Sequence, residues 1–279
     1  MRVTMLKTFL ELAEIRSFHK AAERLNVTQS TVSSRIRELE QDVGQRLFTR
    51  SRAAAELTRA GRTFVPYARQ VVRAIQQARQ EIALPKGFVG ILRVGTTPFL
   101  WDRFVLGLLK RFQARNTNVA IDMFVGDRDA LLAKIDDGTL DLAILYSPMI
   151  KHDWTAKRLF SENLVLLSTE RRKLVRWHPK YVFIDWGHQF RDEHNRAYPV
   201  DETAIVTFQD ARVAFDYLMR VGGSGYLPMP WVRQAAHGRP FHVVRGAPNF
   251  SIEAFAVYDN ASIGDEWRAD ALNGLLGNV

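Results

Sequence analysis

The sequence predicts an α/β protein with an all-α-type winged helix-turn-helix N-terminal domain and a two-lobed α/β C-terminal domain. Three observations predict this fold class. Short capped amphipathic helices follow one another before residue 58, strands alternate with helices after residue 86, and the positive charge is concentrated near the N-terminus. The expected domains are a DNA-binding domain over 1–58, a dimerisation linker helix over 59–86 and a regulatory domain over 87–279.

Charge and composition narrow the class of partner. The 279-residue chain has a net charge of +9, and residues 1–86 hold 16 Lys and Arg against 8 Asp and Glu, whereas residues 87–279 hold 23 against 22. Because neutralising phosphates requires local positive charge, the first segment is predicted to bind a polyanion. The chain has no cysteine, no apolar run near the ~20 residues of a membrane span and no signal-peptide core. A cytoplasmic protein is therefore expected.

Three helices are predicted before residue 44. Apolar residues recur at three- and four-residue steps over 4–14, Ser17 can cap a helix over 18–25, and Thr28 can cap a third helix that ends at Gly44. The short turn between the second and third helices is typical of a helix-turn-helix. The polar face of the third helix can enter a major groove, although an exposed face without a partner is the alternative. The residues expected to contact DNA there are Thr28, Gln29, Ser30, Ser33, Ser34 and Arg37.

A β-wing is predicted after the third helix. A short apolar strand is followed by three arginines and then by a second strand around Leu57. Arginines at a wing tip can lie along the DNA backbone or in a narrow minor groove, and a solvated basic loop is the alternative. Arg50 and Arg52 are therefore further expected DNA contacts.

A long helix from Thr58 to about residue 84 carries a heptad pattern. Its apolar residues follow spacings of 4, 3, 4, 3 and 4, which predicts pairing with a second copy of the chain. Pro66 predicts a kink or a lost hydrogen bond. A paired helix implies a two-fold dimer that fits a pseudo-palindromic site, and the break at 85–87 marks the domain boundary. The predicted seam is Phe64, Ala68, Val71, Ile75, Ala78 and Ile82.

The second half of the chain predicts two α/β lobes. Strands over 91–95, 119–125 and 140–146 alternate with helices over 101–113 and 130–136, which is typical of a parallel sheet. Further strands are expected near 163–168, 181–185, 204–208 and 225–228, with helices near 211–221 and 229–236.

The loops after the strands predict a ligand site. In open parallel sheets the ligand crevice lies beyond the carboxyl ends of the strands, where helix N-termini favour an anion such as a carboxylate. Thr97 either caps its helix or contacts the ligand, and Asp127 is better explained as a helix cap. Tyr146 and Trp186 either line a pocket or pack in the core. The residues expected around a small-molecule effector are Thr96, Thr97, Asp127, Tyr146, Trp186 and His188.

Two other classes of function are alternatives to a ligand-responsive regulator. An enzyme would need a catalytic constellation, but GxSxG, HExxH and GxxxxGK are absent and the seven histidines lack metal-ligand spacing. No catalytic residue, metal site or cofactor is therefore predicted. A nucleoid-type architectural protein would have no need of the regulatory domain, which makes up about two thirds of the chain.

The chain resembles the LysR-type transcriptional regulators over residues 6–61, which read LKTFLELAEIRSFHKAAERLNVTQSTVSSRIRELEQDVGQRLFTRSRAAAELTRAG. Weaker similarity to the effector lobes of that family lies in LLAKIDDGTLDLAILY and GGSGYLPMPWV. The linker segment and the stretch VFIDWGHQF with the histidine that follows are similar to the HdfR-like branch, which is associated with repression of flagellar genes.

The resemblance implies a periplasmic-binding-protein-like sensor domain and a homodimer or homotetramer. It implies promoter DNA and a small-molecule effector as partners, with RNA polymerase as a further partner of an activator. It places the DNA contacts at Gln29, Ser30, Ser33, Ser34, Arg50 and Arg52, and many family members have an arginine where Ser34 stands.

Overall fold

The computed structural model describes residues 1–49, 55–148, 150–174, 178–199, 204–260 and 266–277. The chain forms two compact units, Met1–Lys86 and Gly87–Val279. Each unit has its own hydrophobic core. No helix in the described ranges is both long and apolar enough to span a membrane.

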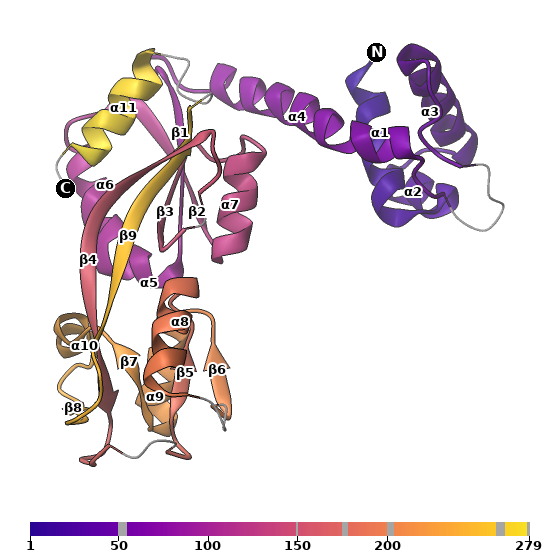
Figure 1. Cartoon of the computed structure of the whole chain (residues 1–279). Helices are drawn as coiled ribbons and strands as arrows, with labels where there is room; N and C mark the ends of the chain where they lie inside the picture. The colour runs from indigo at the N-terminus through magenta and orange to yellow at the C-terminus, as the bar shows by residue number, and fades with distance from the viewer. Residues whose placement is uncertain (50–54, 149, 175–177, 200–203, 261–265, 278–279) are drawn as a thin grey trace. The chain divides into compact units, whose positions relative to one another are not determined.

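The first unit contains four helices: α1 (Val3–Ile15), α2 (Phe18–Arg24), α3 (Gln29–Val43) and α4 (Arg59–Ile82). All four predicted helices are confirmed (Figure 1). The predicted caps Ser17, Thr28, Gly44 and Thr58 are confirmed as well. The Ser17 hydroxyl accepts a hydrogen bond from the Lys20 amide, and the Thr28 hydroxyl accepts one from the Thr31 amide at 3.2 Å. Gly44 ends α3 at a φ of 72°, a left-handed conformation that glycine adopts without strain.

Aromatic packing holds the first unit together. The Phe9 ring of α1 lies 5.5 Å from the ring of Phe48 and 5.3 Å from that of Phe64, measured between centroids. Ala21 is fully buried, and its small side chain allows α2 to lie close to the other helices. Helix α1, the base of the wing and the start of α4 therefore share one core.

The base of the wing is held by a carboxylate. Glu40 Oε1 accepts hydrogen bonds from the amides of Leu47 at 2.8 Å and Phe48 at 3.1 Å. Among the described residues, the two predicted strands are reduced to a single antiparallel bridge between Phe48 and Leu57. The predicted DNA contacts Arg50 and Arg52 lie outside the described residues.

Helix α4 runs through Pro66 as one 24-residue element. The Thr58 hydroxyl accepts a hydrogen bond from the Gly61 amide at 3.0 Å and caps the helix. The predicted seam divides into two parts: Phe64 and Ala68 pack against the core of their own unit, whereas the later positions lie beyond it. Val71, Ala78 and Ile82 are exposed, and Ile75 is half-buried.

The second unit is built on a sheet of order β2-β1-β3-β9-β4-β7, with β8 beside β4. Strands β1 (Gly90–Thr96), β2 (Val119–Val125) and β3 (Leu142–Tyr146) are parallel, which confirms the predicted βαβαβ unit. Strands β5 (Val182–Ile184) and β6 (Val206–Phe208) form a separate parallel pair in the second lobe. The remaining strands are β7 (Ser224–Leu227) and β8 (His242–Val243).

Two long antiparallel strands, β4 (Trp154–Ser168) and β9 (Phe250–Asp259), lie side by side and join the two lobes (Figure 1). The sequence predicted only 163–168 as a strand, because that part is almost wholly apolar. The first half of β4 alternates half-buried and exposed positions and carries several charges. Pairing with β9, about 100 residues away in the chain, makes it a strand.

The helix predicted over 101–113 consists of three elements. They are α5 (Pro98–Leu100), the π-helix η1 (Trp101–Val105) and α6 (Leu106–Gln113). Three further predicted helices are confirmed as α7 (Arg128–Asp136), α9 (Ala211–Val221) and α10 (Met229–Ala235).

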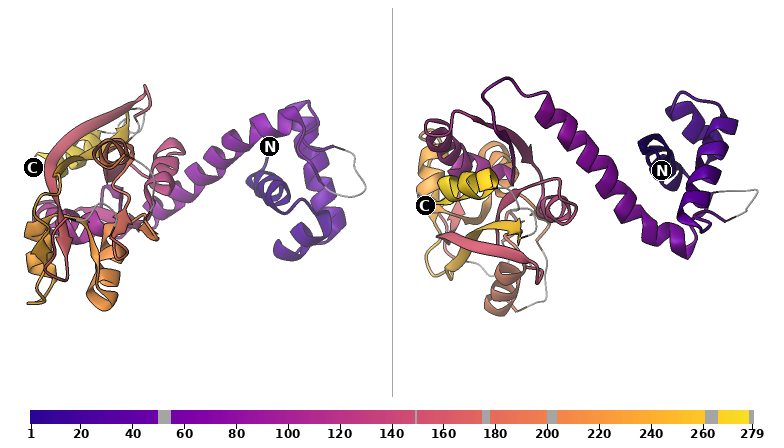
Figure 2. Two further views of the ribbon diagram at one scale, coloured as in Figure 1. Left: turned by 60° about the horizontal axis from the view of Figure 1, so that its bottom comes forward. Right: turned by 90° about the horizontal axis from the view of Figure 1, so that it is seen from above.

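Two helices were not predicted, α8 (His188–Ala197) and α11 (Glu266–Leu276). Helix α11 packs against α6 and β1 (Figure 2). Trp267 of α11 lies directly over Gly90, where an added Cβ would come within 2.3 Å of the indole ring. A side chain at this position of β1 would therefore force the indole to shift.

Candidate DNA-binding face and interlobe contact

The candidate DNA-binding face is the outer side of α3. Val32, Ile36 and Leu39 are buried in the first unit, so the helix turns its other side to solvent. Gln29, Ser30, Ser34 and Arg37 are exposed on this side, and Ser33 is half-buried.

Local hydrogen bonds distinguish the residues of this face. The Thr28 hydroxyl is hydrogen-bonded to the Ser30 hydroxyl at 2.8 Å as well as to the Thr31 amide, and Arg37 Nε donates to the Ser33 carbonyl at 3.2 Å. Thr28 is thus a structural cap. The side chains of Gln29 and Ser34 make no hydrogen bond to other described residues, so their polar atoms are free for another partner.

In the second unit, an aromatic cluster joins the two lobes. The Phe99 ring of α5 lies 6.2 Å from Tyr146, 5.1 Å from Trp186 and 4.7 Å from Trp231, measured between centroids. Tyr146, the last residue of β3, and Trp186, which follows β5 in the other lobe, have ring centroids 5.6 Å apart. The loops after these strands therefore converge, and in this structure aromatic rings fill the space between them.

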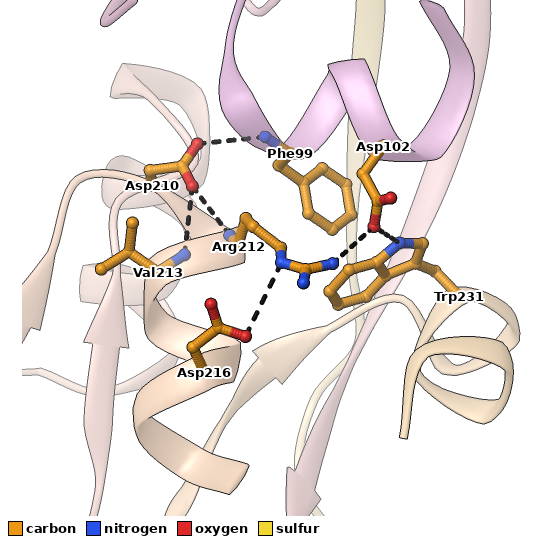
Figure 3. A network of polar contacts seen from close by, with 7 residues as sticks. All are labelled: Phe99, Asp102, Asp210, Arg212, Val213, Asp216 and Trp231. Carbon is orange, nitrogen blue, oxygen red and sulfur yellow. Dashed lines mark hydrogen bonds and ion pairs between the residues drawn. The ribbon is translucent and has the colours of Figure 1, made fainter. Parts of the chain in front are cut away.

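A polar network runs beside this cluster (Figure 3). The Asp210 carboxylate accepts hydrogen bonds from the amide of Phe99 in the other lobe at 3.3 Å and from the amide of Arg212 at 2.8 Å. Burial raises the pKa of Asp210. Asp102 Oδ2 is 2.8 Å from Arg212 Nη1 and 3.2 Å from Trp231 Nε1. Backbone amides and side chains of both lobes thus meet at two carboxylates.

The effector candidates at the ends of β1 and β2 differ in their hydrogen-bond partners. The Thr96 hydroxyl is buried and donates to the Ile144 carbonyl at 3.0 Å. Asp127 accepts from the Ala130 amide at 2.8 Å, which confirms its interpretation as a helix cap. Thr97 precedes α5 without making a side-chain cap.

The other three candidates lie at the ends of later strands. Trp186 is buried, and its Nε1 donates to the Tyr226 carbonyl at 3.0 Å. His188 is exposed at the start of α8. Just before it, Gly187 packs against the Arg128 guanidinium of the first lobe, since an added Cβ would lie 3.0 Å from Nη2.

The Tyr146 hydroxyl lies in an unusual environment. It is buried and has no hydrogen-bond partner among the described residues. Burial raises the pKa of Tyr146 well above its usual value, and the nearby Glu162 carboxylate adds to that shift. Burial also raises the pKa of Glu162, which is paired with Arg103 at 2.8 Å. Tyr146 therefore stays a neutral donor.

Comparison with known proteins matches both units to one family. Residues 3–62 match the family described as bacterial regulatory helix-turn-helix protein, lysR family, and residues 85–262 match the LysR substrate binding domain. The chain belongs to the LysR family of transcriptional regulators. This LysR-type regulator therefore has a DNA-binding helix-turn-helix domain and an effector-binding domain.

Relatives over nearly the full length support the HdfR-like branch. The transcriptional regulator HdfR of Escherichia coli (strain K12 / MC4100 / BW2952) is 30% identical over 98% of this chain and 99% of its own. HdfR of Salmonella schwarzengrund is 30% identical over 92% of each chain.

Solved structures share the fold of this LysR-type regulator. CbnR bound to its target DNA aligns with a TM-score of 0.71 at 19% identity, covering 100% of this chain and 99% of CbnR. A full-length variant of OxyR from Pseudomonas aeruginosa aligns with a TM-score of 0.61 at 24% identity, covering 99% of this chain and 94% of OxyR. LysR regulators bind promoter DNA and small-molecule effectors, form oligomers and are not enzymes.

Sequence reasoning missed the polar network of this LysR-type regulator. Its hydrogen bonds join residues that are separated in the sequence by 110, 111 and 129 positions. No short-range spacing pattern can indicate such contacts. One signal was available: Asp210 immediately precedes the helix predicted over 211–221 and is its N-cap. Its second role, as acceptor for the Phe99 amide, depends on how the lobes meet.

Proposed function

We propose that this LysR-type regulator binds a pseudo-palindromic promoter site as a dimer or as a pair of dimers. The observation that carries the proposal is the free polar face of α3, held in place by the Thr28 cap and a buried core stripe. Gln29 and Ser34 are the proposed base-reading side chains, because their polar atoms have no partner among the described residues. Ser30, Ser33 and Arg37 flank them, and Arg50 and Arg52 are proposed to contact the DNA backbone or minor groove.

Pairing is proposed through the later part of the α4 seam. Val71, Ile75, Ala78 and Ile82 keep the heptad spacing, and none of them belongs to the core of the first unit. Such a pair would present two copies of α3 to two half-sites.

The proposed regulatory input is a small organic acid bound where the lobes of the second unit meet. Thr97 and His188 are proposed to face it, with Trp186 and Tyr146 as walls and Thr96 and Asp127 as support. A ligand that favours one arrangement of the lobes changes the assembly of the regulatory domains, and through it the spacing of the DNA-binding heads. No catalytic step is needed. The proposed place of action is the cytoplasm, with RNA polymerase as a partner if the protein activates transcription.

Footprinting on promoter DNA tests the main proposal. Protection of a discrete pseudo-palindromic site is expected, and uniform protection of any duplex contradicts it. Gln29→Ala should cost about 1–3 kcal/mol of binding at particular base pairs. Gln70→Ala, which changes an exposed glutamine of α4 outside the seam, is the matched control. If Gln29→Ala leaves the base preference unchanged, Gln29 is not a base reader.

Analytical ultracentrifugation of Ile75→Asp tests the pairing. A buried charge in an apolar seam is strongly unfavourable, so the variant is expected to be monomeric. The control Gln76→Asp changes the next residue, which is exposed and lies off the heptad positions. An Ile75→Asp protein that sediments like the wild type would show that the seam is not the dimer interface.

A further inference from the structure

A cavity of about 390 Å³ lies between η1, α9 and α10, on the side of the polar network where Trp231 and Arg212 are found. It shares no residue with the six effector candidates predicted from the sequence. Its volume is within the range of small-molecule sites, roughly 300–1,000 Å³. Because η1 belongs to the first lobe and α9 and α10 to the second, a ligand in this cavity touches both.

The charges that line the cavity leave one cation uncompensated. Arg103 is held by Glu162, with Nε and Nη2 at 3.0 and 2.8 Å from Oε1. Arg212 lies between two carboxylates, with Nη1 at 2.8 Å from Asp102 and Nε at 3.7 Å from Asp216 (Figure 3). Arg220, one helical turn after Asp216, is exposed and has no acidic partner among the described residues.

Apolar side chains also line the cavity. Phe215 and Met219 of α9 face the cavity together with Trp231 of α10, and the rings of Phe215 and Trp231 are 4.7 Å apart. Phe215 and Trp231 are buried and form the floor of the cavity, whereas the half-buried Met219 offers the larger apolar surface. A ligand with an apolar body can bury it against these side chains.

The backbone of η1 is unusual at this cavity. The Leu106 amide donates to the Trp101 carbonyl, five residues back, so the helix widens by one residue between α5 and α6. Such π-turns are rare in proteins overall, but those that occur often lie at functional sites. This turn carries Asp102 and Arg103, both of which line the cavity.

We propose that this cavity binds a small organic acid, with its carboxylate on the Arg220 guanidinium and its apolar body on Phe215, Met219 and Trp231. The bound acid adds contacts between η1 and the helices of the second lobe, and so stabilises the arrangement of the lobes seen here. The regulatory consequence of this site rests on the proposed function, but the binding itself does not.

The test uses the full chain with two probes, phenylacetate and hexanoate, and their neutral amides as controls. Isothermal titration calorimetry without DNA should show saturable binding of at least one acid and at least tenfold weaker binding of its amide. Arg220→Gln should weaken binding of the acid at least tenfold. Arg233→Gln, which changes an exposed arginine of α10 that does not line the cavity, should leave it unchanged.

Three outcomes overturn the assignment. They are no binding of either acid up to about 10 mM, equal binding of acid and amide, and unchanged binding by Arg220→Gln. If Arg220→Gln changes the oligomeric state and not the binding, this face is a contact between copies of the chain and the assignment is wrong.

A footprint with and without the bound acid separates this assignment from the proposed function. If the acid binds as described but the footprint stays the same, the cavity site stands and only its regulatory consequence fails. If the chain protects a discrete promoter site but binds neither acid, only the cavity assignment fails.

Discussion

The face of α3 and the contact between the two lobes are built in opposite ways. On α3 the candidate residues lie within ten positions of one another on a single helix, and a local cap holds them. Between the lobes, Phe99 and Asp102 meet Asp210, Arg212 and Trp231, which lie more than 100 residues later. The first site is therefore set by local periodicity, and the second exists only where distant segments pack together.

The two units can be followed by different spectroscopic signals. All six tryptophans lie beyond residue 100, so tryptophan fluorescence reports on the second unit alone, whereas circular dichroism reports on the helices of both. Variants in the first unit should thus change circular dichroism and spare tryptophan fluorescence, whereas variants in the second unit should change both.

Gly61→Val should have the largest effect and confine it to the first unit. A Cβ at Gly61 would lie 2.1 Å from the Leu47 carbonyl oxygen and 2.9 Å from Leu57 Cδ2. Such an overlap should cost at least about 3 kcal/mol, since neither backbone can move freely. Urea unfolding should show an early loss of helix and no promoter binding, with the tryptophan transition unchanged. Gly107→Ala in α6, where the nearest atom is at 3.8 Å, should leave both transitions in place. A Gly61→Val protein of normal stability would contradict the packing of α4 against the wing.

His194 should make the second unit sensitive to acid. Burial lowers the pKa of His194 from 6.5 to about 4, and its Nε2 lies 2.8 Å from the Tyr181 hydroxyl. The unfolded chain binds the proton at higher pH, so stability is complete above pH 6.5 and is lost as the pH falls toward 4, by up to about 3 kcal/mol. The stability of the second unit, measured by tryptophan fluorescence, should depend on pH in this way in the wild type and should lose this dependence in His194→Gln. The control His19→Gln changes an exposed histidine of the first unit. Equal pH slopes for wild type and His194→Gln would contradict the shift.

Asp102→Ala should have the smallest effect. It removes the acceptor for Arg212 and Trp231, but the Asp102 and Arg212 side chains are 41% and 39% exposed, so solvent screens the ion pair. The free energy of unfolding of the second unit, measured by tryptophan fluorescence, is expected to fall by about 1 kcal/mol. Promoter binding by the first unit should be retained in the absence of effector. Asp122→Ala, at an exposed position of β2, is the control. A larger loss than in His194→Gln at neutral pH would mean that the network between the lobes contributes more than its exposure indicates.

The sequence was sufficient for the elements whose stabilising contacts are local. The caps Ser17, Thr28 and Thr58 mark the starts of α2, α3 and α4, and the predicted helices agree with the observed ones within about two residues. In the second unit the parallel strands and α7, α9 and α10 followed from the same kind of pattern. The first half of β4, all of β9 and the helices α8 and α11 did not. The first half of β4 is stabilised by a partner far away in the chain, whereas β9 alternates between buried and more exposed residues and could have been predicted.

The candidate sites show the same difference between features set by local contacts and features set by distant ones. The exposed residues of α3 followed from periodicity and capping, and Asp127 was rightly interpreted as a cap. The structure added that the later α4 residues, unlike Phe64 and Ala68, lie outside the core of the first unit.

By itself the sequence determined that the chain joins a basic helix-turn-helix to a near-neutral two-lobed α/β domain through a heptad helix. Charge, capping and periodicity act between residues a few positions apart, and they can be read from the chain. Only the tertiary structure decided that the loops after Thr96 and Tyr146 close on aromatic rings. It also placed Asp102 and Asp210 between the lobes, and it left Arg220 without an acidic partner among the described residues. Those features arise from packing between segments far apart in the chain, which no local pattern encodes.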